Sequence, residues 1–233
     1  MEKAKLILVP GLLCDALLWR AQVEHLSDVA EMWVADHTRS ETMAGVARDV
    51  LADAPFETFA LAGLSMGGYV SLEIMRQAPQ RVLKLALLDT AARGETLEQT
   101  ERRNGFLELA ERGKFAGITE TLMPQLIHSS RLDDIALTEA IKAMAKNVGK
   151  EAFVRQQRAI MSRAESRPLL AAIRCPTLVL CGRQDQLTPL DRHEEMAAGI
   201  SGARLEVLED CGHMSTMEKP EQVNRALRRW LAA

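Results

Sequence analysis

A serine bracketed by glycines lies in the segment GLSMGG, at residues 63–68. The segment stands between the alternating stretch ETFALA and the stretch YVSLEIMRQA, whose spacing predicts a helix. Small residues at such a turn let a helix pack closely against a sheet, which is one interpretation. The other is chemical, because a sharp turn from a strand into a helix holds a serine hydroxyl out into a cleft. The segment by itself leaves both interpretations open.

Two side chains that can assist a serine nucleophile follow later strand candidates. Asp185 comes just after PTLVLCG (176–182), and His213 comes just after ARLEVLE (203–209). Taken singly, Asp185 can cap a helix and His213 can be an ordinary loop histidine. The chain order Ser, Asp, His, each just beyond a strand, is the order of a hydrolytic triad on a parallel sheet. Together they predict nucleophilic catalysis by Ser65.

In this interpretation each residue has a separate task. His213 takes the proton of Ser65 as a general base, and Asp185 holds the imidazole and stabilises the imidazolium. The sharp turn forces Ser65 into a sparsely populated backbone conformation, at a cost of about 1–3 kcal/mol. Gly63 and Gly67 are expected there because side chains would collide across the turn. The backbone N–H of Met66 supplies one donor to the tetrahedral oxyanion.

Apolar runs alternate with helical patterns along most of the chain, which predicts a mostly parallel sheet covered by helices on both faces. The strand candidates are 5–10, 31–36, 58–63, 81–89, 176–182 and 203–209. In such open sheets ligands bind at the carboxyl ends of the strands, where the three reactive residues fall. The fold class predicted from this rhythm is α/β.

The rhythm breaks between Arg93 and Pro168, where the sequence contains only helical patterns. Leu137, Ile141 and Met144 lie on one helical face. The predicted organisation is therefore a core of residues 1–92 and 169–233, with an all-helical cap at 93–168. The cap carries 13 Lys/Arg and 11 Asp/Glu, and its net charge of +2, against −5 for the remainder, is too small to indicate an anionic ligand.

Composition excludes several classes of function. The 233 residues are 47% hydrophobic and carry a net charge of −3 with intermixed signs, so no nucleic-acid or membrane partner is predicted. The four cysteines form no C-x-x-C or metal-spaced cluster, and neither metal nor cofactor is expected. The apolar stretch before Cys14 resembles a lipoprotein signal only superficially, because Pro10–Gly11 interrupts it and Leu13 is too large for a cleavage site. A cytoplasmic protein with reduced thiols is predicted.

Four segments give the chain a close resemblance to the α/β-hydrolase fold family: VPGLL (9–13), GLSMGG (63–68), CPTLVLCGRQDQLTP (175–189) and CGHMSTMEKPEQV (211–223). The resemblance implies a cap of variable sequence and a sheet of about six parallel strands that lacks the family's usual first two. It also implies that the backbone N–H of Leu12 is the second oxyanion donor. Pro10 departs from the family pattern, where histidine often precedes the glycine. That histidine generally has a supporting role, so the implied mechanism is unaffected.

Other reactive side chains have weaker sequence contexts. Asp89 ends a strand candidate and rivals Asp185 as the acid, but no family motif surrounds it. His128 lies in the cap, where a solvated position is favoured over contact with substrate. No local positive charge marks Cys14 or Cys211 as a thiol of lowered pKa.

The remaining histidines and the cap methionines are interpreted as structural. Three histidines fall in or beside helices and are predicted to be surface residues: His25, His37 and His193. Three methionines are predicted to form the interior of the cap, with pliable pocket walls as an additional role: Met123, Met144 and Met161.

The sequence thus predicts a serine hydrolase, a carboxylesterase or lactonase acting through an acyl-enzyme on Ser65 on a small, fairly apolar molecule. A C–C hydrolase of vinylogous diketones, which the family resemblance allows with the same triad, is the alternative enzyme. A ligand sensor that retains a slow triad is the alternative of another class. The expected partner is a small-molecule substrate, and the choice between monomer and homodimer stays open.

Overall fold

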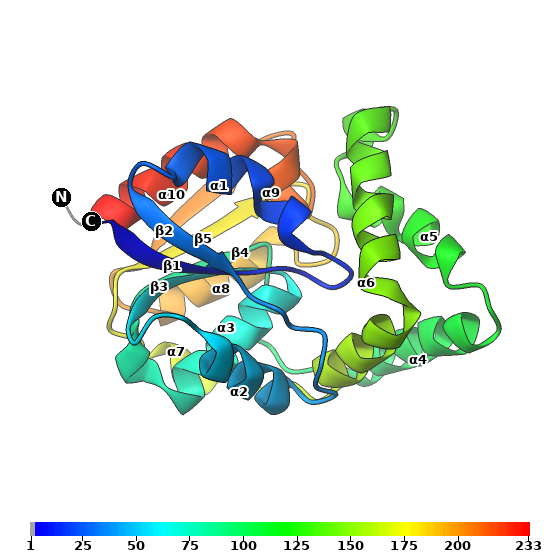
Figure 1. Cartoon of the computed structure of the whole chain (residues 1–233), viewed down its shortest axis with the longest axis horizontal. Helices are drawn as coiled ribbons and strands as arrows, with labels where there is room; N and C mark the ends of the chain where they lie inside the picture. The colour runs from blue at the N-terminus through cyan, green and yellow to red at the C-terminus, as the bar shows by residue number, and fades with distance from the viewer. Residues whose placement is uncertain (1–2) are drawn as a thin grey trace.

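The computed structural model describes residues 3–233 (Figure 1), so Met1 and Glu2 of the predicted core lie outside the described residues. Six parallel strands form one sheet in the order β2-β1-β3-β4-β5-β6. The strands are β1 (Ala4–Val9), β2 (Ala30–Val34), β3 (Phe59–Leu64), β4 (Val82–Leu88), β5 (Thr177–Gly182) and β6 (Arg204–Leu208). The predicted six-stranded parallel sheet is confirmed.

The central strands are apolar without alternation because helices cover both faces of the sheet. Every residue of β3 and of β5 is buried. Along β1, Leu6 and Leu8 pack into the core on one face, and Ile7 and Val9 pack into the core on the other. The sheet therefore sits between two layers of helix, as Figure 1 shows.

The helices of the two layers come from the connections between strands and from the segment after β6 (Figure 1). One layer holds the 3₁₀ helix η1 (Ala16–Trp19), α1 (Arg20–Leu26), α9 (Ser215–Glu218) and α10 (Pro220–Ala232). The other layer holds α2 (Met43–Asp53), α3 (Met66–Gln77), α7 (Arg167–Leu170) and α8 (Leu190–Gly199). The short 3₁₀ helix η2 (Pro79–Arg81) leads into β4. No helix in residues 3–233 is both long and apolar enough to cross a membrane.

The segment between β4 and β5 contains helices and no strand, as predicted for residues 93–168, which we call the helical insertion. Its helices are α4 (Leu97–Glu111), α5 (Ala116–Leu126), the 3₁₀ helix η3 (Ser129–Arg131) and α6 (Ile135–Met161), followed by α7 at its end. Figure 1 shows α4, α5 and α6 standing together beside one end of the sheet. The helical insertion thus faces the edge at which parallel strands present their carboxyl ends.

Helix α6 is interrupted at Gly149, whose φ of 79° and ψ of 169° are non-helical. The apolar positions predicted before the break, Leu137, Ile141 and Met144, are buried. Phe153, beyond the break, is buried as well and packs in a small core of the helical insertion. The break falls at a glycine, because a positive φ is a conformation that glycine adopts without strain.

Candidate active site

The turn at Ser65 joins β3 directly to α3 and has a strained backbone. Ser65 has φ 56° and ψ −116°, outside the regions that non-glycine residues favour. A Cβ on Gly63 would overlap the carbonyl oxygen of Gly67, and a Cβ on Gly67 would overlap that of Val9. The expectation that both glycines are needed for the close approach is confirmed. The packing interpretation and the chemical interpretation of this segment are therefore compatible. The glycines let α3 pack closely, and this close packing places the Ser65 side chain at the carboxyl end of β3.

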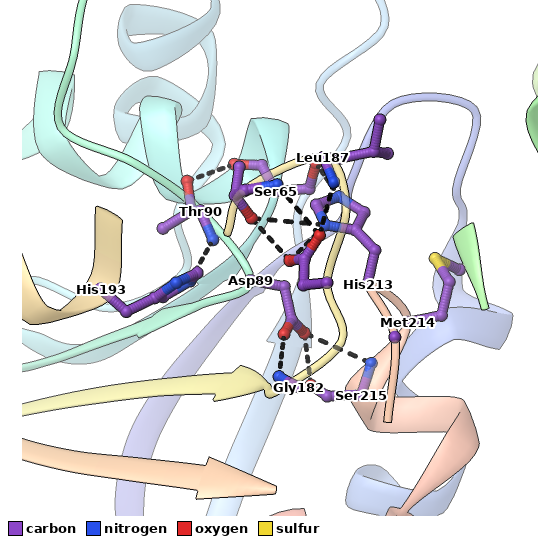
Figure 2. A network of polar contacts seen from close by, with 12 residues as sticks. Ser65, Asp89, Thr90, Gly182, Leu187, His193, His213, Met214 and Ser215 are labelled. Carbon is purple, nitrogen blue, oxygen red and sulfur yellow. Dashed lines mark hydrogen bonds and ion pairs between the residues drawn. The ribbon is translucent and has the colours of Figure 1, made fainter. Parts of the chain in front are cut away.

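Ser65, His213 and Asp185 form one hydrogen-bonded chain. The Oγ of Ser65 lies 2.8 Å from Nε2 of His213, and Nδ1 of His213 lies 2.8 Å from Oδ2 of Asp185. Figure 2 shows Ser65 and His213 side by side above the strand ends. Each strand contributes through the loop at its carboxyl end, so residues far apart in sequence meet at one edge of the sheet. Both distances are within the hydrogen-bond reach that proton transfer requires.

Hydrogen bonds fix the carboxylate of Asp185 in one orientation. Its Oδ1 accepts from the backbone N–H groups of Leu187 and Thr188, at 2.8 and 2.9 Å. Its Oδ2, which faces His213, also accepts from Thr188 Oγ at 2.6 Å. Burial alone would raise the pKa of Asp185, but the charge of His213 and these hydrogen bonds outweigh burial and lower it. Asp185 is therefore an ionised acceptor, and Thr188 is a supporting residue that sequence reasoning missed.

The loop that carries His213 is held by a buried glutamate. Glu218 is 3% exposed, and its Oε1 accepts from the N–H groups of Gly212 and Met214 at 3.0 and 3.2 Å. Its Oε2 accepts from the N–H of His128 at 2.7 Å, and the N–H of His213 donates to the carbonyl of Leu126 at 3.0 Å. The helical insertion therefore contributes two of the contacts that hold this loop. Sequence reasoning assigned Glu218 no role, although it lies in the motif that contains His213.

Asp89, the rival acid, lies near the same loops but in a different hydrogen-bond set (Figure 2). Its Oδ1 accepts from Gly182 N–H at 3.1 Å, and its Oδ2 accepts from the N–H of Ser215 at 3.3 Å and from the Ser215 hydroxyl. Within residues 3–233 no hydrogen bond joins it to His213. Complete burial, and then the charge of Asp185, raise its pKa well above the ordinary value, which favours the uncharged acid.

The loop that follows β1, residues 10–15, is called the first-strand loop. It lies against Ser65, because a Cβ on Gly11 would lie 3.4 Å from the Cβ of Ser65. The N–H of Leu13 donates to Oε1 of Gln156 at 3.1 Å and is not available to a ligand. Neither Leu12 N–H nor Met66 N–H donates a hydrogen bond to a group within residues 3–233. Both backbone N–H groups predicted as oxyanion donors therefore lack a hydrogen-bond acceptor in residues 3–233.

Two histidines predicted to be surface residues are buried, and that prediction is wrong for both. His37 is 2% exposed, and its Nε2 lies 2.9 Å from the carbonyl of Gly11 and 3.0 Å from the Gln156 amide nitrogen. Burial lowers its pKa. His37, which contacts Gly11, and Gln156, which contacts Leu13, thus hold the first-strand loop at two points.

His193 is fully buried in α8, and burial lowers its pKa to about 4. Its Nε2 accepts from the N–H of Thr90 at 2.9 Å, and the Thr90 hydroxyl donates to the Ser65 carbonyl at 2.8 Å (Figure 2). His193 therefore supports the turn through Thr90. Met196, one helical turn later, is buried on the same face of α8. This apolar residue at helical spacing is the sequence signal that could have predicted the burial of His193. His25 is exposed, as predicted.

A pocket of about 950 Å³, including its opening to solvent, lies above Ser65 and His213. Its apolar lining from the helical insertion consists of Phe106, Leu122, Leu126, Ile141, Ala145 and Ile160. Polar residues of the insertion also line it: Gln99, Arg102, Arg103, Thr119 and Gln157. Both the size and the mixed lining suit a small molecule with few polar groups.

Several residues with a possible role in the pocket lie elsewhere. Met123 and Met144 are buried, but in a hydrophobic cluster that the helical insertion shares with the α/β core, and neither they nor Met161 lines the pocket. His128 does not line it either, and its Nδ1 contacts the Ser130 hydroxyl at 2.7 Å. Cys14 does line the pocket, but burial raises the pKa of its thiol to about 12, which makes it a poor nucleophile at neutral pH.

Replacing Ser65 with glycine should stabilise the fold. Ser65→Ala is the matched reference, because both variants lose the hydroxyl and only glycine relieves the positive φ. After the backbone entropy of glycine is subtracted, we expect the free energy of unfolding to be about 1 kcal/mol higher for Ser65→Gly than for Ser65→Ala. Urea titrations of the two variants measure this difference. A less stable glycine variant would contradict the strain at this turn.

The rate should fall in acid as His213 is protonated, because only the neutral imidazole accepts a proton. Burial alone would lower the pKa of His213, but the charge and hydrogen bond of Asp185 outweigh burial and raise it above 6.5. We therefore expect kcat/KM to reach half its plateau above pH 6.5 and to decline at lower pH. A pH profile with a soluble ester measures this midpoint. A plateau extending below pH 6 would be inconsistent with the raised pKa.

Comparison with known proteins agrees with this architecture. Residues 5–220 match the model of the alpha/beta hydrolase fold family. A thermophilic esterase from Thermogutta terrifontis, determined with malate bound, is 32% identical and superposes with a TM-score of 0.90 over 98% of this chain and 89% of that chain. An enol-lactonase from Burkholderia xenovorans LB400 is 22% identical, has a TM-score of 0.90, covers 100% of this chain and 93% of its own, and shows the shared fold alone.

A similar curated protein is the 2-hydroxy-6-oxo-6-phenylhexa-2,4-dienoate hydrolase of Comamonas testosteroni. It is 29% identical over 203 residues, which are 84% of this chain and 70% of the relative. The family match spans both sides of the helical insertion and every strand of the sheet except the first residue of β1. The chain belongs to the α/β-hydrolase fold family and is a hydrolase of that family.

Proposed function

We propose that the protein hydrolyses an ester or lactone of a small molecule through an acyl-enzyme on Ser65. The observation that carries the proposal is the hydrogen-bonded chain from Asp185 through His213 to Ser65, with 2.8 Å at both contacts of the imidazole. Ser65 and His213 of this hydrogen-bonded chain line a pocket. A serine hydroxyl becomes a stronger nucleophile when a neighbouring histidine takes its proton. The carboxylate accepts a hydrogen bond from the histidine and so fixes the tautomer in which Nε2 is free to act as the base.

The steps follow from the atoms present. Ser65 Oγ attacks the carbonyl carbon while Nε2 of His213 takes the hydroxyl proton, and the N–H groups of Leu12 and Met66 bind the oxyanion. His213 then protonates the leaving alcohol, and an acyl-enzyme remains. A water molecule, deprotonated by the same nitrogen, releases the acid and restores Ser65. Asp185 stays ionised throughout and stabilises the imidazolium.

The helical insertion acts in this proposal as a cap that selects the substrate. Its apolar lining residues can bury a short acyl chain, with about 0.8 kcal/mol for each methylene until the pocket is full. Phe106 is the one aromatic residue of the insertion that lines the pocket. Ester hydrolysis is supported by the similarity to the Thermogutta esterase. Cleavage of a C–C bond in a diketone is the second candidate, and the Comamonas relative supports it.

Burst kinetics test the proposal. Short-chain 4-nitrophenyl esters should release one equivalent of nitrophenol rapidly and then reach a slower steady rate, because deacylation follows acylation. A fluorophosphonate probe should label Ser65 and block turnover. Rapid labelling without turnover of esters or lactones, but with cleavage of a diketone, would favour the C–C hydrolase. Labelling with turnover too slow for metabolism would favour a ligand sensor. Absence of labelling at Ser65 would overturn the nucleophile.

A further inference from the structure

The pocket has one strongly polar wall, which the charge of the helical insertion as a whole did not indicate. Helix α4 contributes Gln99, Arg102 and Arg103 to the lining, and Tyr69 and Gln157 lie in the same lining. Two of the lining residues are arginines, and none is Asp or Glu. The two arginines therefore give this part of the lining a positive charge that no acidic lining residue offsets.

Arg103 is already paired with a carboxylate within the protein. Its guanidinium donates to Glu95 and to the amide oxygen of Gln157, both at 2.8 Å, and its side chain is 12% exposed. Glu95 also pairs with the buried Arg163. One carboxylate thus pairs with two arginines, and these contacts hold the Arg103 side chain in a structural cluster.

Arg102 is the cation that remains available to a ligand. It is exposed, lines the pocket, and forms no hydrogen bond or ion pair within residues 3–233. Partial burial and the charge of Arg103 lower its pKa, and the nearby charge of Glu98 offsets these two effects only in part. An anion in the pocket would supply the missing partner.

Gln99 adds a neutral donor on the same face of α4, three residues before Arg102. Its Oε1 accepts from the Thr96 N–H at 3.1 Å and from Arg163 at 3.2 Å, which fixes the side-chain amide. Its Nε2 donates to no group in the described part of the chain and so remains free. A guanidinium and an amide N–H that lie three residues apart on one helix and line the same pocket can each donate to one oxygen of a carboxylate.

We propose that the substrate carries a carboxylate, and that Arg102 and Gln99 bind it while Ser65 attacks an ester or lactone carbonyl in the same molecule. The inference rests on the proposed function and names its substrate class. Arg102 is the one lining arginine without an ion-pair partner in the described residues, and one guanidinium fits one negative charge, which favours a carboxylate over a phosphate dianion. The apolar lining residues would contact the carbon chain between the two groups.

Paired substrates test the inference in the full chain. The charged substrate is the mono-4-nitrophenyl ester of adipic acid, and the neutral one is its methyl ester. Shorter half-esters are avoided because their own carboxylates attack the ester at high effective concentration. The ratio of kcat/KM for the charged over the neutral ester is measured in the wild type, Arg102→Gln, Arg102→Glu and Arg112→Gln. Arg112 caps the same helix with a side chain that is 73% exposed and does not line the pocket.

The wild type should prefer the charged ester. Arg102→Gln should lower kcat/KM for the charged ester by about 10- to 100-fold, as expected for a lost charged hydrogen bond, and leave the neutral ester within about twofold. Arg102→Glu should lower it further, and Arg112→Gln should change neither rate. An unchanged ratio in Arg102→Gln, or equal losses on both esters, would overturn the inference. A phosphonate analogue preferred over the carboxylate would overturn the assignment of the anion.

Binding to the Ser65→Ala variant separates this inference from the proposed function, because it needs no turnover. Calorimetry with phenyl half-adipate and with its methyl ester should show tighter binding of the anion, and Arg102→Gln in the same background should remove the difference. Equal affinities would overturn the anion site even in an active esterase. A retained difference in a protein without esterase activity would keep the site and reject the ester chemistry.

Discussion

Replacing Ser65 with alanine is expected to lower kcat by about six orders of magnitude if the three residues act as a unit. Without the hydroxyl, His213 has no nucleophile to deprotonate, and only the oxyanion donors and the pocket still assist a water molecule. Alanine keeps the side-chain volume small and leaves the strained backbone unchanged, so the fold should survive. Single-turnover and steady-state rates with a 4-nitrophenyl ester measure the loss, and circular dichroism verifies folding.

Ser71→Ala provides the matched control for this experiment. Ser71 lies in α3 and is fully buried, and its hydroxyl donates to the Gly67 carbonyl at 2.7 Å. Removing this hydroxyl should leave kcat within about tenfold of the wild type, because a neutral hydrogen bond of this kind contributes about 1 kcal/mol. If Ser65→Ala kept more than a few per cent of activity, another nucleophile would have to be sought.

Replacing Asp185 with asparagine should lower the rate by about four orders of magnitude, because the hydrogen bonds of this side chain determine how the amide is oriented. Oδ1 accepts from two backbone N–H groups, so the amide oxygen must occupy that position. The NH₂ then takes the place of Oδ2 and donates to Nδ1 of His213. The imidazole proton is forced onto Nε2, which can no longer accept the proton of Ser65. Steady-state kinetics with the same ester measure the loss.

Asp89→Asn is the control for the acid and should change the rate less than tenfold. Burial raises the pKa of Asp89 and favours the uncharged acid, so an amide is a close replacement in charge as well as in shape. Its oxygen can accept from Gly182, its NH₂ can donate to the Ser215 hydroxyl, and only the 3.3 Å contact with Ser215 N–H is lost. A large loss for Asp89→Asn with a small loss for Asp185→Asn would make Asp89 the partner of His213.

The parts of the site that the sequence could predict are those that follow strand ends. Parallel strands put their carboxyl ends at one edge, so the order of Ser65, Asp185 and His213 along the chain implied that they meet. The glycines of the turn could also be predicted, because a sharp turn limits the space for side chains locally. These features depend on short-range geometry and on the alternation of strands and helices.

The supporting residues could not be predicted, because their role depends on which segments meet in three dimensions. Gln156 contacts the first-strand loop across 143 positions of sequence, and Glu218 meets His128 across 90. His37 and His193 were misplaced at the surface for the same reason. Arg102 and Arg103 are adjacent in sequence, yet only the position of Glu95 shows which of them is paired with a carboxylate.

The hydrogen bonds that cross between the helical insertion and the strand-end loops bear on how such an enzyme can change during evolution. Gln156 holds the loop with the Leu12 amide, and the Leu126 carbonyl holds the backbone of His213. A relative's cap grafted onto this core would have to reproduce both attachments or lose turnover along with selectivity. New substrates are therefore reached more readily by point changes in the lining of the pocket than by exchange of whole segments.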